Sequence, residues 1–213
     1  RGDVDVVWFA GFVGHLEVSL EQPLVQRFFD RLGAFARVIV YDKRGQGLSD
    51  RPDGAATMEE HAEDALAVMD AAGIERATLV GVSEGGPAAI VFAAAHPDHI
   101  AKLVLYGTYA RMLHDEDYPH GASLAGLERM RERALNDWGD PVALHAFAPS
   151  MANDPAFGAW WARLLRLGVS RSGMRQLLNT WEELDVRAAL PLIGVPTLVM
   201  ARSTDRITPI AWS

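Results

Sequence analysis

The chain has 213 residues, 49% of them hydrophobic, and its 20 basic and 28 acidic side chains give a net charge of −8. This composition fits a folded globular protein and argues against nucleic acid or an anionic membrane as the main partner. The lack of cysteine excludes disulfides, thiolate catalysis and cysteine-based zinc sites. The longest apolar runs, about eight residues, are shorter than the roughly 18 needed for a membrane span. A cytoplasmic protein is expected, although the absence of a visible signal peptide carries little weight because the chain opens with Arg1 and not with Met.

Short, nearly continuous apolar runs alternate with helical patterns in the first half of the chain and return near its end. In chain order, the predicted strands are 4–10, 36–42, 77–82, 101–107 and 196–201. Helical patterns cover 24–32, 58–73 behind the capping box of Thr57 and Glu60, and 87–96. Buried strands that alternate with helices predict an α/β fold, with a mostly parallel sheet flanked by helices.

The alternation stops between residues 108 and 190, where the sequence favours helix throughout. We therefore expect a core at 1–107, a helical cap inserted at 108–190, and the start of the second part of the core at 191–213. An insertion at this point would lie over the carboxyl ends of the strands, where sites are built. Trp160 and Trp181 lie on its apolar faces and are candidates for a substrate pocket, although most of these faces are better explained as packing within the cap.

A serine lies among glycines at the end of the third predicted strand. Gly81, Ser83 and Gly85 form the pattern G-x-S-x-G between a strand and a helix, which is the context of a nucleophile elbow. Such a turn excludes side chains on both sides of the serine and directs its hydroxyl to the carboxyl edge of the sheet. We expect Ser83 to be a nucleophile, with the N–H of Glu84 available to an oxyanion. The alternative is an ordinary glycine turn.

A second oxyanion donor is expected from the loop after the first strand, AGFVGH at 10–15. Gly11 lets the backbone approach closely, and the N–H of Phe12 would then point at the serine. An ordinary turn after a buried strand is the alternative.

The sequence offers a candidate for the acid of a serine triad but no good candidate for its base. Asp205 follows the last predicted strand, where a triad acid is found when the order is Ser, Asp, His, although it could instead pair with Arg206. No histidine follows Asp205, and His15, the histidine nearest the expected site, has no acid nearby to orient it. We expect the chain to be part of a longer protein, with the triad histidine beyond Ser213 and these 213 residues inactive by themselves.

These motifs resemble the α/β-hydrolase family over nearly the whole chain. AGF is similar to the family's oxyanion loop, DKRGQGLS at 42–49 to its D-x-R-G-x-G-x-S turn, GVSEGG to its elbow and STDRITP to its acid loop. Glu84 departs from the family, in which Met, Leu or Gln is commoner; a carboxylate there would alter the charge preference for substrate or simply face solvent. The set GF-x-x-HLE, DKRG-x-GLSDR, GVSEGGP and LVLYG-x-YAR is similar to hydrolase-like domains found beside bacterial nucleotide cyclase domains, which makes a cyclase-type domain a candidate partner.

The resemblance implies an esterase that hydrolyses small carboxylic esters through a Ser-His-Asp triad and an acyl-enzyme, with no cofactor and no metal. A serine at the elbow disfavours relatives with an aspartate nucleophile, but perhydrolase, thioesterase and C–C hydrolase activities share the same constellation. A ligand-sensing module that keeps the pocket, lacks the chemistry and regulates an attached cyclase-type domain is the alternative from a different class. A histidine after the acid loop would favour the enzyme.

Overall fold

The computed structural model describes residues 4–212. Five parallel strands form one sheet in the order β2-β1-β3-β4-β5. Their bounds are β1 Val4–Phe9, β2 Ala36–Val40, β3 Ala77–Val82, β4 Ile100–Tyr106 and β5 Thr197–Met200. The α/β architecture expected from the sequence is confirmed, and the strands end within two residues of their expected positions.

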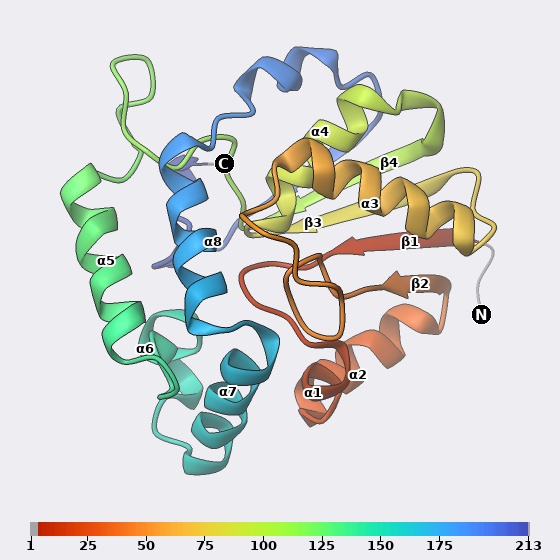
Figure 1. The fold of residues 1–213 in the computed structure, drawn as a ribbon. Coiled ribbons are helices and arrows are strands. Elements are labelled where there is room, and N and C mark those ends of the chain that lie inside the picture. Colours follow the sequence, from red (N-terminus) through yellow and green to blue (C-terminus); the bar gives the residue numbers. More distant parts are fainter. Residues whose placement is uncertain (1–3, 213) are drawn as a thin grey trace.

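Helices cover both faces of this sheet (Figure 1). The helices of the core are α1 Leu16–Leu20, α2 Pro23–Gly33, α3 Met58–Ala71 and α4 Gly85–Ala95. Successive side chains of a strand point to opposite faces, so Trp8 and Phe9 identify which helix lies where. Trp8 packs edge-on against Phe28 and Phe29 of α2, whereas Phe9 packs against Phe92 of α4. The main core lies between the sheet and α3 and α4.

Local sequence signals account for the ends of the core helices. The Thr57 hydroxyl accepts the N–H of Glu60 at 3.1 Å, and the Glu60 carboxylate accepts the N–H of Thr57 at 2.9 Å. This reciprocal capping box fixes the start of α3 as the sequence indicates. The apolar α4 is buried along nearly its whole length, which is why it shows no amphipathic pattern.

The segment between β4 and β5, here called the cap, places its helices beyond the carboxyl ends of the strands (Figure 1). Its helices are α5 Leu124–Asn136, α6 Leu144–Phe147, α7 Pro155–Gly168 and α8 Arg171–Glu183. The cap has an apolar cluster of its own, which includes Leu127, Met174, Leu178 and Trp181. The chain enters and leaves it side by side, where the N–H of Val186 donates to the carbonyl of Ala110 at 2.8 Å.

One expectation for this segment is wrong, because residues 108–123 contain no helix. The chain doubles back here, with hydrogen bonds from the N–H of His114 to the carbonyl of Ala122 and from the N–H of Ala122 to that of Met112. Pro119 disfavours a continuous helix, and Gly121 approaches His114 so closely that an added Cβ would lie 2.4 Å from its nitrogen. Within the described residues, no helix is long and apolar enough to cross a membrane.

Candidate active site

Ser83 occupies the sharp turn between β3 and α4. Its φ angle is +50°, in the left-handed region that residues with a side chain seldom adopt. Its N–H donates to the carbonyl of Tyr106 at 3.0 Å, and its carbonyl accepts the Thr108 hydroxyl at 2.6 Å. The neighbouring strand β4 and the second residue of the loop to the cap therefore hold this turn in place.

The glycines around Ser83 are required by close backbone approaches. A Cβ added to Gly85 would lie 2.2 Å from the carbonyl oxygen of Phe9, and one added to Gly81 would lie 2.8 Å from the Cα of Gly86. Gly86 is equally constrained, since its Cβ would meet the Thr108 hydroxyl at 1.8 Å. No side chain fits at these positions without moving β1, Thr108 or the elbow itself.

The loop after β1 lies directly against the serine. A Cβ on Gly11 would lie 3.2 Å from the Cβ of Ser83. Among the described residues, neither the N–H of Phe12 nor that of Glu84 has a hydrogen-bond acceptor. Free amides beside a serine hydroxyl are what an oxyanion site requires.

Asp205 lies on the loop after β5, beside the end of β4. Its Oδ1 accepts the N–H groups of Ile207 and Thr208, both at 2.9 Å, which fixes the orientation of the carboxylate. No ion pair with Arg206 is present in the described part of the chain. Oδ2 is directed toward Gly107 and would lie 3.8 Å from a Cβ there.

These groups line one cavity of about 630 Å³ between the sheet and the cap. Gly11, Phe12, Ser83, Trp160 and Asp205 all contribute to its wall. Much of the remaining wall is apolar and comes from α2 and the cap, with Phe28, Phe29, Phe147, Trp161 and Leu164 among its members. Such a cavity suits a small, largely apolar ligand with a polar group at Ser83. No cluster of three or more metal-binding side chains occurs within residues 4–212.

The sequence profile of the alpha/beta hydrolase fold matches residues 6–212. The chain belongs to the alpha/beta hydrolase fold family.

Several relatives of this alpha/beta hydrolase carry the names of hydrolytic enzymes. It is 32% identical to a putative carbamate hydrolase, RutD, of a Caulobacter species, over 90% of this chain and 69% of that one. It is 29% identical to 3-oxoadipate enol-lactonase 2 of Acinetobacter baylyi, over 99% of this chain and 75% of that one. Among solved structures, the enol-lactonase of Burkholderia xenovorans superposes with a TM-score of 0.76 at 25% identity, over 99% of this chain and 77% of that one. Together they support hydrolysis as the class of reaction.

The elbow glycines Gly81 and Gly85 do not line the cavity, and neither do the side chains of Trp181 and Glu84. Trp181 is buried with Met174 and Leu178 in the cap, where its ring packs against Phe12 at 5.6 Å between centroids. The Glu84 side chain is buried beneath the elbow, so it neither faces solvent nor reaches a ligand in the cavity. Burial raises the pKa of Glu84, and the nearby Lys43 ammonium opposes that rise.

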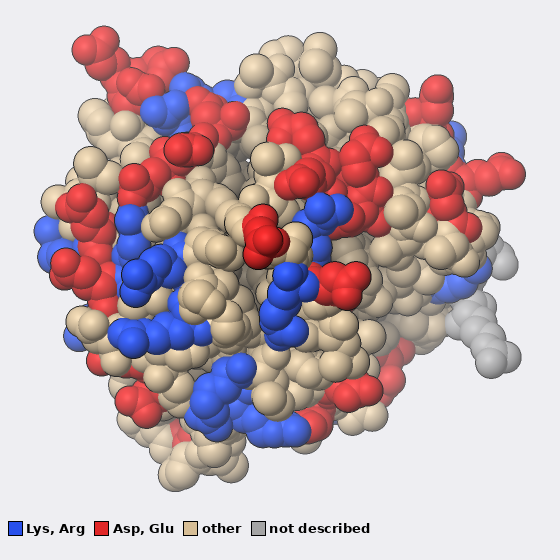
Figure 2. Space-filling model, in the orientation of Figure 1, with Lys and Arg blue, Asp and Glu red and all other residues tan. Residues whose placement is uncertain are grey.

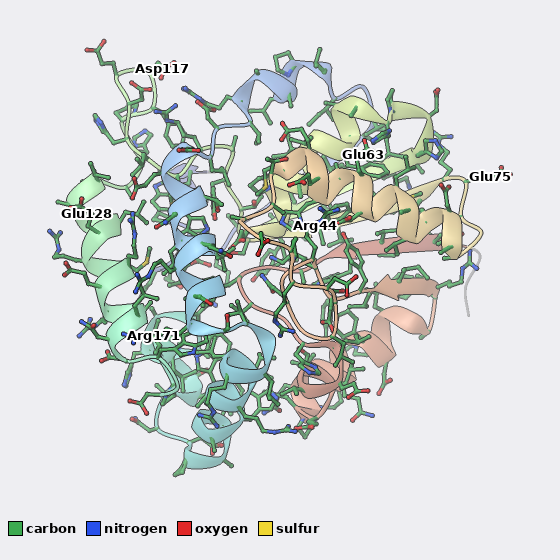
Figure 3. All side chains as sticks on the ribbon, viewed as in Figure 1. Arg44, Glu63, Glu75, Asp117, Glu128 and Arg171 are labelled. Atoms are coloured by element: carbon green, nitrogen blue, oxygen red, sulfur yellow. The ribbon has the colours of Figure 1, made fainter. Side chains whose placement is uncertain are left out.

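The sequence interpretation missed Lys43, which lies on the D-x-R-G loop and is also buried. Its ammonium donates to the carbonyl of Gly11 at 2.6 Å and lies 3.6 Å from Glu84 Oε1. The sequence did contain a signal for a buried cation: Glu84 is the only charged residue in the stretch 77–95 and therefore required a partner. Its neighbour Arg44 instead faces α3 and pairs with Asp64 at 2.5 Å (Figure 3).

A second, smaller cavity of about 270 Å³ lies on the other side of the elbow, between the loop after β2 and α8. Its wall includes Arg44, His61, Glu84 and Ser170. Burial, with Lys43 as a further cause, lowers the pKa of His61 to about 4, so this imidazole is neutral near pH 7. His61 therefore lies behind the elbow, separated from the cavity that Ser83 faces.

Proposed function

We propose that the protein hydrolyses small carboxylic esters, with Ser83 as the nucleophile. The observation that carries this proposal is that the Ser83 elbow, the free amide of Phe12 and the carboxylate of Asp205 border the same cavity. The two enol-lactonase relatives support acyl transfer as the reaction.

The proposed chemistry follows from these positions. A histidine takes the proton of the Ser83 hydroxyl as its oxygen attacks the acyl carbon, and the N–H groups of Phe12 and Glu84 stabilise the oxyanion. The histidine returns the proton to the departing alcohol, which leaves an acyl-enzyme. Water, deprotonated by the same histidine, then releases the carboxylic acid and restores the serine.

We propose that this histidine lies outside the 213 residues, with Asp205 orienting it. Of the seven histidines in the chain, His15 is the one that lines the cavity, and its Nδ1 is buried without a hydrogen-bond partner among the described residues. Asp205 makes no hydrogen bond to His15. Without an acid to orient and stabilise it, an imidazole is a poor general base.

The test is turnover of a p-nitrophenyl ester by the complete protein and by its Ser83→Ala variant. We expect kcat to fall by about 10⁴-fold or more in the variant, because the nucleophile is lost. Equal rates would rule out Ser83. A His15→Asn variant should keep the rate, whereas a loss as large as that of Ser83→Ala would assign the base to His15. If the complete protein binds an ester and leaves it intact, the ligand-sensing alternative gains support.

A further inference from the structure

Lys43 and Glu84 form an ion pair that is almost completely removed from solvent. Their side chains are 7% and 3% exposed, and the nearest nitrogen–oxygen distance is 3.6 Å. Lys43 comes from the loop after β2 and Glu84 from the elbow after β3, so the pair links two loops that are 41 positions apart in the sequence.

Such a pair is a poor source of stability. Removing two charges from water costs free energy that their mutual attraction seldom recovers, and two apolar side chains would pack there at least as well. A second acceptor, Oε2 of Glu84, is buried with no hydrogen bond of normal geometry in the described structure. The Trp181 indole lies near enough to lower the carboxyl pKa, and the Tyr109 hydroxyl is also within its electrostatic reach. The arrangement calls for an explanation other than packing.

The contacts of the Lys43 ammonium supply an explanation for this buried pair. It donates to the carbonyl oxygen of Gly11 at 2.6 Å and, more weakly, to that of Phe12 at 3.4 Å. The Gly11 carbonyl and the Phe12 N–H belong to one planar trans peptide, in which the C=O and N–H bonds point in opposite directions. A cation held on the oxygen therefore directs the N–H away from Lys43 and makes its hydrogen more positive.

We propose that Lys43 and Glu84 are positioning residues that fix the two oxyanion donors relative to each other. Lys43 orients the peptide that carries the Phe12 N–H, and Glu84 holds Lys43 while its own backbone supplies the second N–H. This inference rests on the proposed function, since it assigns the pair to the oxyanion site of that reaction. It also explains why a carboxylate follows the nucleophile without facing the cavity.

The experiment uses Lys43→Met, Glu84→Gln and the double variant in the complete protein. The same substitutions at exposed positions serve as controls: Lys102→Met, at the only other lysine of the chain, and Glu128→Gln on the outer side of α5 (Figure 3). The measurements are kcat and KM for a p-nitrophenyl ester, the thermal unfolding temperature, and deuterium exchange of the amides of residues 10–15.

We expect Lys43→Met to lower kcat by about 10- to 100-fold with KM changed less than about threefold, since loss of a whole oxyanion donor costs about 10²- to 10³-fold. Glu84→Gln should lower the unfolding temperature most, because it leaves a buried cation unpaired. The double variant should regain the unfolding temperature but not kcat, and exchange over residues 10–15 should rise in both variants that lack Lys43. Both controls should match the unchanged protein.

Recovery of kcat together with stability in the double variant would show that the pair is only structural and would overturn the inference. Unchanged kcat in Lys43→Met would overturn it as well. If the unchanged protein and Ser83→Ala hydrolyse the ester equally, the proposed function fails. The positioning role of Lys43 is then tested by deuterium exchange alone. Exchange over residues 10–15 that is unaffected by Lys43→Met would reject the positioning role.

Discussion

Ser83 is held in a strained backbone conformation by its neighbours. A φ of +50° costs about 1–3 kcal/mol for a residue with a side chain and persists only where the surroundings enforce it. Here its N–H is bonded to Tyr106, and its carbonyl accepts both the N–H of Gly86 and the hydroxyl of Thr108. The main chain therefore carries the strain, and the serine hydroxyl needs no structural bond of its own.

His61 should make stability depend on pH in mildly acidic solution. Its pKa is about 4 in the folded protein, chiefly because of burial, against about 6.5 when unfolded. The unfolded chain therefore binds the proton more readily, so the stability present above pH 6.5 is lost as the pH falls toward 4. The loss amounts to at most about 3 kcal/mol. We expect His61→Gln to remove this part of the pH dependence in urea unfolding measured from pH 7 to pH 4.

The control for this prediction is His114→Gln, because His114 is exposed on the loop before α5. This variant should retain the full pH dependence of the unchanged protein. Parallel stability curves for His61→Gln and the unchanged protein across the interval would contradict a neutral, buried His61.

At the scale of elements, periodicity and capping were sufficient for the core but not for the cap entrance. The strand predicted at 77–82 has those bounds, and the Thr57 capping box starts α3. Both signals are local, which is why they can be recognised in the sequence. The doubled-back segment 108–123 depends on Gly121 lying against His114, a tertiary contact that leaves no periodic pattern.

In the site, too, local signals could be recognised in the sequence and contacts between distant segments could not. Ser83, Asp205 and the loop at Gly11 each follow a strand, and parallel strands bring their carboxyl ends to one edge, so their meeting at one cavity could be predicted. The direction in which a side chain points at that edge could not be predicted from the sequence. Glu84 turns beneath the elbow to meet Lys43, and Trp181 turns into the cap, because each finds its partners in segments far away in the sequence.

The cap is attached to the core between α1 and α7. The Trp160 indole N–H donates to the carbonyl of Val18 at 2.7 Å, and Arg163 pairs with Glu21 nearby. Trp160→Phe removes the hydrogen bond but keeps most of the ring, so we expect a loss of about 1 kcal/mol in unfolding free energy. Deuterium exchange in 155–168 should rise at the same time.

Arg163→Gln provides the comparison, since it breaks an exposed ion pair across the same contact. Exposed pairs contribute about 0–1 kcal/mol, so this variant should unfold almost like the unchanged protein. A larger effect from Arg163→Gln than from Trp160→Phe would mean that the ion pair, not the partly buried indole, holds the cap.

At the scale of the whole molecule, the surface charge is distributed (Figure 2), whereas one strand edge exposes a continuous apolar run. On the face drawn in Figure 2, acidic and basic side chains are interleaved over the cap and the core, so the net charge of −8 does not form one patch there. By contrast, all four residues of β5 are exposed, and its outer edge pairs with no strand among residues 4–212. An open, apolar edge strand is a template for association.

The chain of 213 residues should therefore self-associate through β5. Leu198 is 54% exposed at this edge, and a lysine in its place should lower the average mass measured by light scattering, since charge on an edge strand opposes pairing. Leu48→Lys changes a leucine on the loop after β2 that is even more exposed, at 69%, and should leave association unchanged. Equal average masses for Leu198→Lys and the unchanged chain over a range of concentrations would contradict self-association through β5.

Thr108 joins the Ser83 elbow to the start of the cap segment. Its hydroxyl donates to the carbonyl of Ser83, and its side chain fills the space that a Cβ on Gly86 would need. It is also the point from which the chain departs toward the cap. A different cap sequence inserted after Thr108 would change the cap side of the cavity, and with it the ligands that fit, without altering the backbone contacts that position Ser83.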